Sequence, residues 1–176
     1  MAQKKPRRRY SPNWGGRRPG AGRPKSPHSG APHKARPDIE GNAVVHVWWT
    51  TLPEFPSLRS AKVRRLLHDL IADSADREGC RVVYFGVKRD RLDVVCETDD
   101  SIALTRSMQG LGVRVARQLN GALGRSGKVF AERYREEVLD GREQLETALA
   151  ALGDGPQTVL PPRIRRLKNA YERTVG

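Results

Sequence analysis

Residues 81–97 read RVVYFGVKRDRLDVVCE and predict the centre of the fold. Two apolar runs, Arg81–Val87 and Leu92–Glu97, are rich in β-branched and aromatic residues, which favour strands. The four charged residues 88–91 lie between the runs and are few enough to form a tight connection. The stretch therefore predicts an antiparallel β-hairpin.

The segments on either side of this hairpin show alternating strand and helix patterns. A strand is expected at residues 43–51, and a helix is expected from Ser57, as its N-cap, to Gly79, because apolar residues recur there at helical spacing. After the hairpin, the expected elements are a long helix at 101–123, a short strand within 129–138 and a third helix at 141–152. This order predicts an α+β sandwich, with one antiparallel sheet and helices on one of its faces.

The excess positive charge lies at the two ends of the chain. Residues 1–42 contain 11 Lys and Arg against 2 Asp and Glu, and residues 157–176 contain 5 against 1. Residues 43–156 contain 17 of each and are neutral as a whole. The chain therefore divides into a basic arm, a globular domain and a basic tail with helical potential. Such charge indicates an anionic partner, typically a polyphosphate chain.

The arm contains Arg, Lys, Gly, Pro and Ser with almost no branched apolar residues, so we expect it to be disordered. Within it, residues 16–25 read GRRPGAGRPK, which resembles the core of an AT-hook. Arg23, between a glycine and a proline, could enter a narrow minor groove. The alternative is a basic linker that binds any polyanion. The DNA-binding candidates of the arm are Arg17, Arg18, Arg23 and Lys25.

Other sequence features exclude several classes of protein. The longest apolar stretches are far shorter than the roughly 20 residues that span a membrane, so we expect no membrane segment. The basic N-terminus has no apolar core typical of a secretory signal, which favours the cytoplasm. Cys80 and Cys96 lack the spacing of a zinc site and are expected to be free thiols.

Six blocks of sequence, in this order, resemble the REP-associated tyrosine transposases of the HUH endonuclease superfamily. The blocks are Gly20–Pro24, Pro56–Arg59, the hairpin, Ser107–Leu111, Ala116–Asn120 and Gly127–Tyr134. The resemblance extends from about residue 16 to about residue 152. It implies a ferredoxin-like sheet, DNA as the partner in single-stranded or hairpin form, and a bacterial cytoplasmic protein associated with the nucleoid. It also implies that two copies pair.

The same resemblance implies two metal-binding histidines on the second strand of the hairpin and a tyrosine nucleophile on the last helix. Here Arg91 and Asp93 occupy the histidine positions, and Ala151 occupies the tyrosine position. An Asp can bind Mg²⁺ or Mn²⁺ through oxygen, but a guanidinium repels a cation and has no lone pair to offer. A methyl group cannot attack phosphorus. We therefore expect no cofactor, with Mg²⁺ or Mn²⁺ needed only if the chain is active, and an ion pair between Arg91 and Asp93.

Two other residues are candidates for the lost roles. Tyr134 could replace the nucleophile, although a packing or phosphate-contacting tyrosine is the usual alternative for this residue type. His46, on the first strand, is a metal-ligand candidate in addition to Asp93, and its alternative is a hydrogen-bonded strand histidine.

Candidates for contacts with DNA also occur in the domain. They are Arg114 and Arg117 on the long helix, whose alternative is a solvated outer face, and Lys128 and Arg133 in the last resembling block. The sequence thus predicts a DNA-binding protein of the single-strand transposase type whose catalytic positions are replaced. An active metal-dependent nickase that forms a 5′-phosphotyrosine link and a basic RNA-binding protein remain as alternatives.

Overall fold

The computed structural model describes residues 38–77, 79–153 and 157–175. The predictions for the arm, including Arg17, Arg18, Arg23 and Lys25, lie outside the described residues. In chain order the elements are β1 (Glu40–Thr50), α1 (Ala61–Ala72), β2 (Asp76–Arg77), β3 (Cys80–Val87), β4 (Arg91–Asp100), α2 (Ser101–Ala122), β5 (Arg135–Val138), α3 (Arg142–Ala150), β6 (Gln157–Thr158) and α4 (Arg165–Val175). None of these helices is long and apolar enough to cross a membrane.

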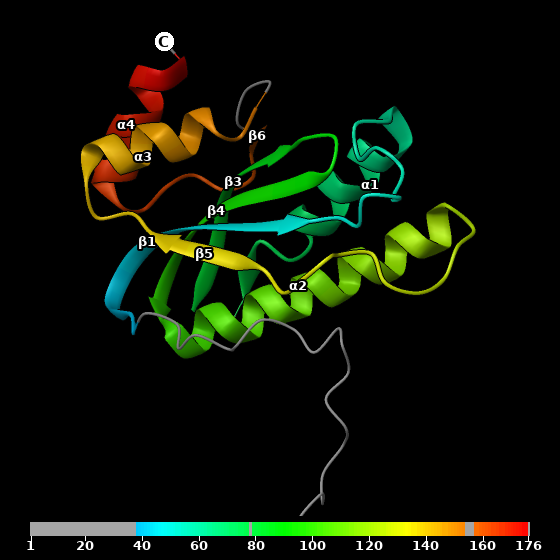
Figure 1. Cartoon of the computed structure of the whole chain (residues 1–176). Helices are drawn as coiled ribbons and strands as arrows, with labels where there is room; N and C mark the ends of the chain where they lie inside the picture. The colour runs from blue at the N-terminus through cyan, green and yellow to red at the C-terminus, as the bar shows by residue number, and fades with distance from the viewer. Residues whose placement is uncertain (1–37, 78, 154–156, 176) are drawn as a thin grey trace, which may run out of the picture. The chain divides into compact units, whose positions relative to one another are not determined.

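The strands form one antiparallel sheet in the order β2-β3-β4-β1-β5, and β6 pairs with β3. The predicted hairpin is present as β3 and β4, with Val87 opposite Leu92. Its turn is closed by the Lys88 amide, which donates to the Arg91 carbonyl at 2.8 Å. The four longest strands, β1, β3, β4 and β5, and the helices α1 and α2 follow the ferredoxin-like order, so the predicted α+β class is confirmed (Figure 1).

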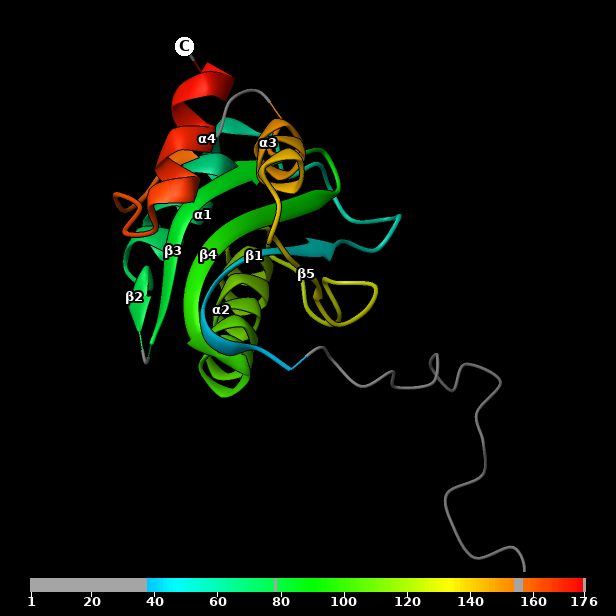
Figure 2. The same cartoon turned by 90° about the vertical axis from the view of Figure 1, so that its left-hand side faces the viewer.

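Alternation along β1 creates two apolar faces of the sheet. Val45, Val47 and Trp49 belong to the larger core, which includes buried residues of α1 and α2. Val44 belongs to a second core with buried residues of α3 and α4. The expectation of helices on one face is therefore corrected: α1 and α2 cover one face, and α3 and α4 lie over the other (Figures 1 and 2).

The first helix begins later than the sequence suggested. Ser60, rather than Ser57, is the N-cap of α1, and its hydroxyl accepts a hydrogen bond from the Val63 amide. Ser57 accepts from the Arg59 amide in the preceding loop. Both serines can close a local turn through the hydroxyl, so the pattern alone could not distinguish the cap from the loop residue.

The C-terminal segment, expected as a basic tail, belongs to the same compact unit as the sheet. Leu167 and Ala170 of α4 are buried in the second core. The ring of Tyr171 stacks on that of Tyr84, with centroids 4.4 Å apart and planes at 9°. Charge dominated the sequence pattern here, while the few apolar residues at helical spacing decide how the segment packs.

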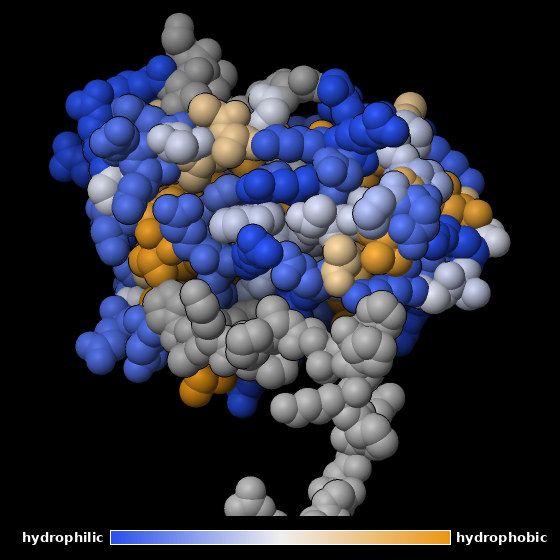
Figure 3. All heavy atoms as spheres, in the orientation of Figure 1, coloured by the Kyte–Doolittle hydropathy of each residue, from blue (hydrophilic) through white to orange (hydrophobic). Residues whose placement is uncertain are grey.

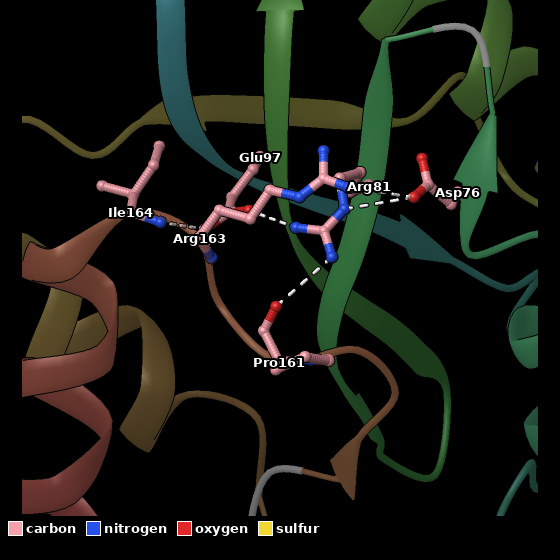
Figure 4. A network of polar contacts seen from close by, with 6 residues as sticks. All are labelled: Asp76, Arg81, Glu97, Pro161, Arg163 and Ile164. Carbon is pink, nitrogen blue, oxygen red and sulfur yellow. Dashed lines mark hydrogen bonds and ion pairs between the residues drawn. The ribbon is translucent and has the colours of Figure 1, made fainter.

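Glu97 on β4 anchors the start of this segment (Figure 4). Its Oε1 accepts hydrogen bonds from the backbone amides of Arg163 and Ile164 at 2.8 and 2.7 Å. Its Oε2 accepts from Arg81 Nη1 at 2.8 Å, and Arg81 also donates to the Pro161 carbonyl. A buried carboxylate thus satisfies the free amides just before α4 and neutralises a buried guanidinium.

Candidate functional site

Three of the predicted site residues meet on the face of the sheet that α3 covers. Arg91 and Asp93 are two residues apart on β4 and therefore point to the same side. His46 lies on the neighbouring strand β1, where Trp48 is opposite Asp93. His46 Nε2 lies 2.8 Å from Asp93 Oδ1, and the Arg91 Nε and Nη2 atoms donate to the same oxygen at 2.9 and 2.5 Å. The predicted ion pair between Arg91 and Asp93 is present.

The Asp93 carboxylate is sealed inside this cluster. Its side chain is 0% exposed, and that of Arg91 is 28% exposed. Its second oxygen, Oδ2, is buried with no hydrogen-bond partner among the described residues. A buried carboxylate is costly unless a cation compensates it, and here the compensating cation is the guanidinium.

These residues do not fit a divalent metal ion. The one hydrogen-bonded oxygen of Asp93 already receives three contacts, and the adjacent guanidinium carries a permanent positive charge that repels a cation. Among residues 38–77, 79–153 and 157–175, no group of three or more His, Cys, Asp or Glu side chains could hold a metal ion. His46 here is a hydrogen-bonded strand histidine, and Asp93 is the acid of an ion pair.

A hollow of about 400 Å³ opens between this cluster and α3. Ala151, at the C-cap of α3, lines it together with His46 and Arg91. Ala151, which the resemblance assigns to the nucleophile, and Arg91, one of the two positions that it assigns to metal ligands, thus line the same hollow, whereas Asp93 is buried and does not line it. Ala151 contributes only a methyl group there, and Thr147 is the hydroxyl-bearing side chain of α3 in the lining.

Tyr134 lies on the other face of the sheet. It is buried in the larger core, and its ring centroid is 5.8 Å from that of Trp49. Trp49 points away from the side of His46 because the two are an odd number of residues apart on one strand. The idea that Tyr134 replaces the nucleophile is therefore wrong, and its role is packing.

Sequence reasoning missed Trp48, which builds one wall of the hollow. The Arg91 guanidinium lies over the Trp48 ring at 4.8 Å, and the His46 ring is 4.9 Å from it. Such stacking holds the guanidinium in place in addition to its ion pair. The available signal was the two-residue spacing from His46 to Trp48, which places both on one face. Two acids, Glu137 and Glu143, also line the hollow.

The predicted DNA-binding residues of the domain lie away from this hollow. Arg114 and Arg117 belong to α2, on the opposite face of the sheet. Arg117 is exposed, whereas burial, with a smaller effect of Arg77, lowers the pKa of Arg114. Lys128 and Arg133 are exposed in the loop between α2 and β5.

Comparisons with known proteins give distant similarities. No family model matches the chain, and no curated protein matches it. A solved structure of a REP-associated tyrosine transposase bound to a REP hairpin is 11% identical, with a TM-score of 0.47. That match covers 62% of this chain and 62% of the other, so the chain spans less than two thirds of its length. A candidate transposase from Deinococcus radiodurans R1 is 18% identical with a TM-score of 0.45, over 68% of this chain and 97% of that one.

Proposed function

We propose that this chain is a DNA-binding protein of the single-strand tyrosine transposase type, which recognises hairpin or single-stranded DNA and does not cleave it. The observation that carries the proposal is the buried Asp93 carboxylate, held by Arg91 and His46. Of the three positions to which the resemblance assigns chemistry, Arg91 and Ala151 line one hollow, and Asp93 is paired with Arg91, so an ion pair and an alanine stand in these positions. This arrangement supports binding without phosphoryl transfer.

The charge of the chain supports a nucleic acid as its partner. The net charge is +13, and the excess lies in the flanks of the sequence rather than around the hollow. Lys and Arg side chains in this number attract a phosphate backbone and make the affinity for nucleic acid depend strongly on salt concentration. The predicted pairing of two copies remains a prediction, which the molecular mass in solution tests.

Binding to a labelled DNA hairpin with single-stranded flanks tests the proposal. Fluorescence anisotropy of the full chain, at several salt concentrations, should give saturable binding whose affinity falls steeply as salt rises. A DNA of the same length that cannot form a hairpin is the control for shape, and an RNA hairpin of the same sequence is the control for the sugar. Absence of binding to the DNA hairpin would overturn the proposal. Clear preference for the RNA would favour the RNA-binding alternative.

A further inference from the structure

The neutral composition of residues 43–156 hides a separation of charge along the sequence. Three segments, 51–65, 88–91 and 122–135, hold eleven Lys and Arg against three Asp and Glu, a net charge of +8. The rest of 43–156 holds six bases against fourteen acids, a net charge of −8. This globular domain, here called the body, is therefore neutral only in its total charge. Its positive and negative residues are concentrated in different segments.

The fold brings these three segments to one end of the sheet, here called the loop end. The segment after β1 is bound to the turn of the hairpin. The Thr51 amide donates to the Asp90 carbonyl, and the Leu58 amide donates to the Arg89 carbonyl, each at 2.8 Å. The segment around Arg89 thus lies against the one that leads into α1.

The third segment joins the same end from the other side. The Leu52 amide donates to the Val129 carbonyl at 2.9 Å. Lys62 Nζ donates to the Ala122 carbonyl at the end of α2, also at 2.9 Å. In Figure 1 the loop after β1, α1, the turn of the hairpin and the end of α2 occupy the same side of the body. Lys and Arg residues that are far apart in the sequence therefore lie on one surface.

The side chains of the loop end suit contacts with phosphates rather than stacking with bases. The exposed basic side chains there include those of Lys62, Arg65, Arg89, Lys128 and Arg133. Arg91 is an exception, because it points to the hollow and pairs with Asp93. The three aromatic residues of the loop end, Phe55, Phe130 and Tyr134, are all buried. Proteins that grip single strands usually present exposed aromatic rings to the bases, whereas basic side chains alone position a duplex backbone.

The hollow beside α3 has the opposite character. Residues 136–156 contain six acids and one base, and two of these acids, Glu137 and Glu143, line the hollow. Phosphates avoid such a site and favour the basic end. The face seen in Figure 3 is mostly hydrophilic, with hydrophobic residues in separate patches.

We infer that the loop end is the surface that contacts the phosphate backbone of the double-stranded stem of a DNA hairpin. This inference rests on the proposed function and places the stem on a surface distinct from the hollow. The N-terminus of α1 lies within the same surface and adds the positive end of a 12-residue helix.

The test compares two triple variants of the full chain that lose the same charge. The first replaces three exposed bases of the loop end, Arg89→Gln, Lys128→Gln and Arg133→Gln. The control replaces three exposed basic residues of the globular domain that lie outside the loop end, Arg77→Gln, Arg106→Gln and Arg142→Gln. The readout is the slope of log affinity against log salt for a DNA hairpin with a stem of about one helical turn. Each lost phosphate contact reduces the magnitude of this slope by about 0.9. The slope should therefore become smaller by about 2.7 in the first variant and stay nearly unchanged in the control.

The outcomes separate this inference from the proposed function. If the chain binds the hairpin and both variants change the slope equally, or the first variant changes nothing, the loop end is not the contact surface and the proposed function stands. If the unaltered chain binds no hairpin, both are overturned. Thermal unfolding shows whether the triple variant is folded, and Arg89→Gln alone should still reduce the slope by about 0.9.

Discussion

Replacing Arg91 by methionine tests whether the guanidinium is what holds the buried carboxylate. Methionine keeps an unbranched apolar stem beside Trp48 but removes both hydrogen bonds to Asp93 Oδ1. In this variant the Asp93 carboxylate keeps only its contact with His46, and its side chain is 0% exposed. A buried charge that loses its partner destabilises the folded state.

The expected loss in free energy of unfolding is about 2 kcal/mol. Breaking a fully buried ion pair costs about 3–5 kcal/mol, and an exposed one costs about 0–1 kcal/mol. The Arg91 side chain is 28% exposed and Asp93 retains His46, so an intermediate value follows. The matched control is Arg135→Met, because the Arg135–Glu132 pair is 63% and 48% exposed and should cost less than about 0.5 kcal/mol.

Urea denaturation of the single and double variants measures this coupling. We expect Arg91→Met combined with Asp93→Asn to cost about 2 kcal/mol less than the sum of the two single changes, because each alone breaks the same pair. A coupling energy near zero, or a loss for Arg91→Met no larger than that of Arg135→Met, would refute the account of Asp93 as a sealed carboxylate.

Three further predictions concern the packing of the C-terminal half. Glu97→Gln should lower the free energy of unfolding by about 2 kcal/mol in urea denaturation, because Arg81 then lacks its buried counter-charge; an unchanged midpoint would contradict this. Gly86→Ala should cost about 3 kcal/mol in the same assay, since the added Cβ would lie 1.9 Å from the Leu152 carbonyl oxygen, and wild-type stability would show that this contact is misplaced. Burial, followed by the nearby Tyr171, raises the pKa of Tyr84 above 10.0, so its stabilising contribution is full below the pKa of an unfolded tyrosine and is lost as pH rises through the folded value. Tyr84→Phe should therefore flatten the decline in unfolding free energy above about pH 10, and an equally steep decline would refute this reading.

The hairpin could be predicted because its strands and turn are local in sequence. The ion pair between Arg91 and Asp93 could also be predicted, since alternate strand residues share a face. The packing of α4 could not, because Glu97 lies 66 residues from Arg163 and the charged surface of the segment obscured its apolar residues. Whether Tyr134 packs in the core or reaches the catalytic positions could not be predicted for a related reason: the sequence does not say which face of the sheet a residue in an irregular loop will join.

The Lys and Arg residues of the loop end can be read directly from the sequence. Their positive charge is cancelled in the total by acidic residues elsewhere in the body. Only the pairing of the loop after β1 with the hairpin turn and with the end of α2 shows that they share a surface. Charge counted by sequence segment is therefore a better guide than charge counted by domain, once the strand order is known.

The central claim, that the chain binds DNA without cutting it, is tested most directly by a covalent-adduct assay. The full chain is incubated with a hairpin DNA labelled at its 3′ end, with Mg²⁺ or Mn²⁺, at a concentration that saturates binding, and is then denatured and separated by electrophoresis. The account predicts that all labelled DNA leaves the protein on denaturation and keeps its full length. A shortened labelled strand that stays attached to the protein in denaturant, in the presence of metal, would contradict it.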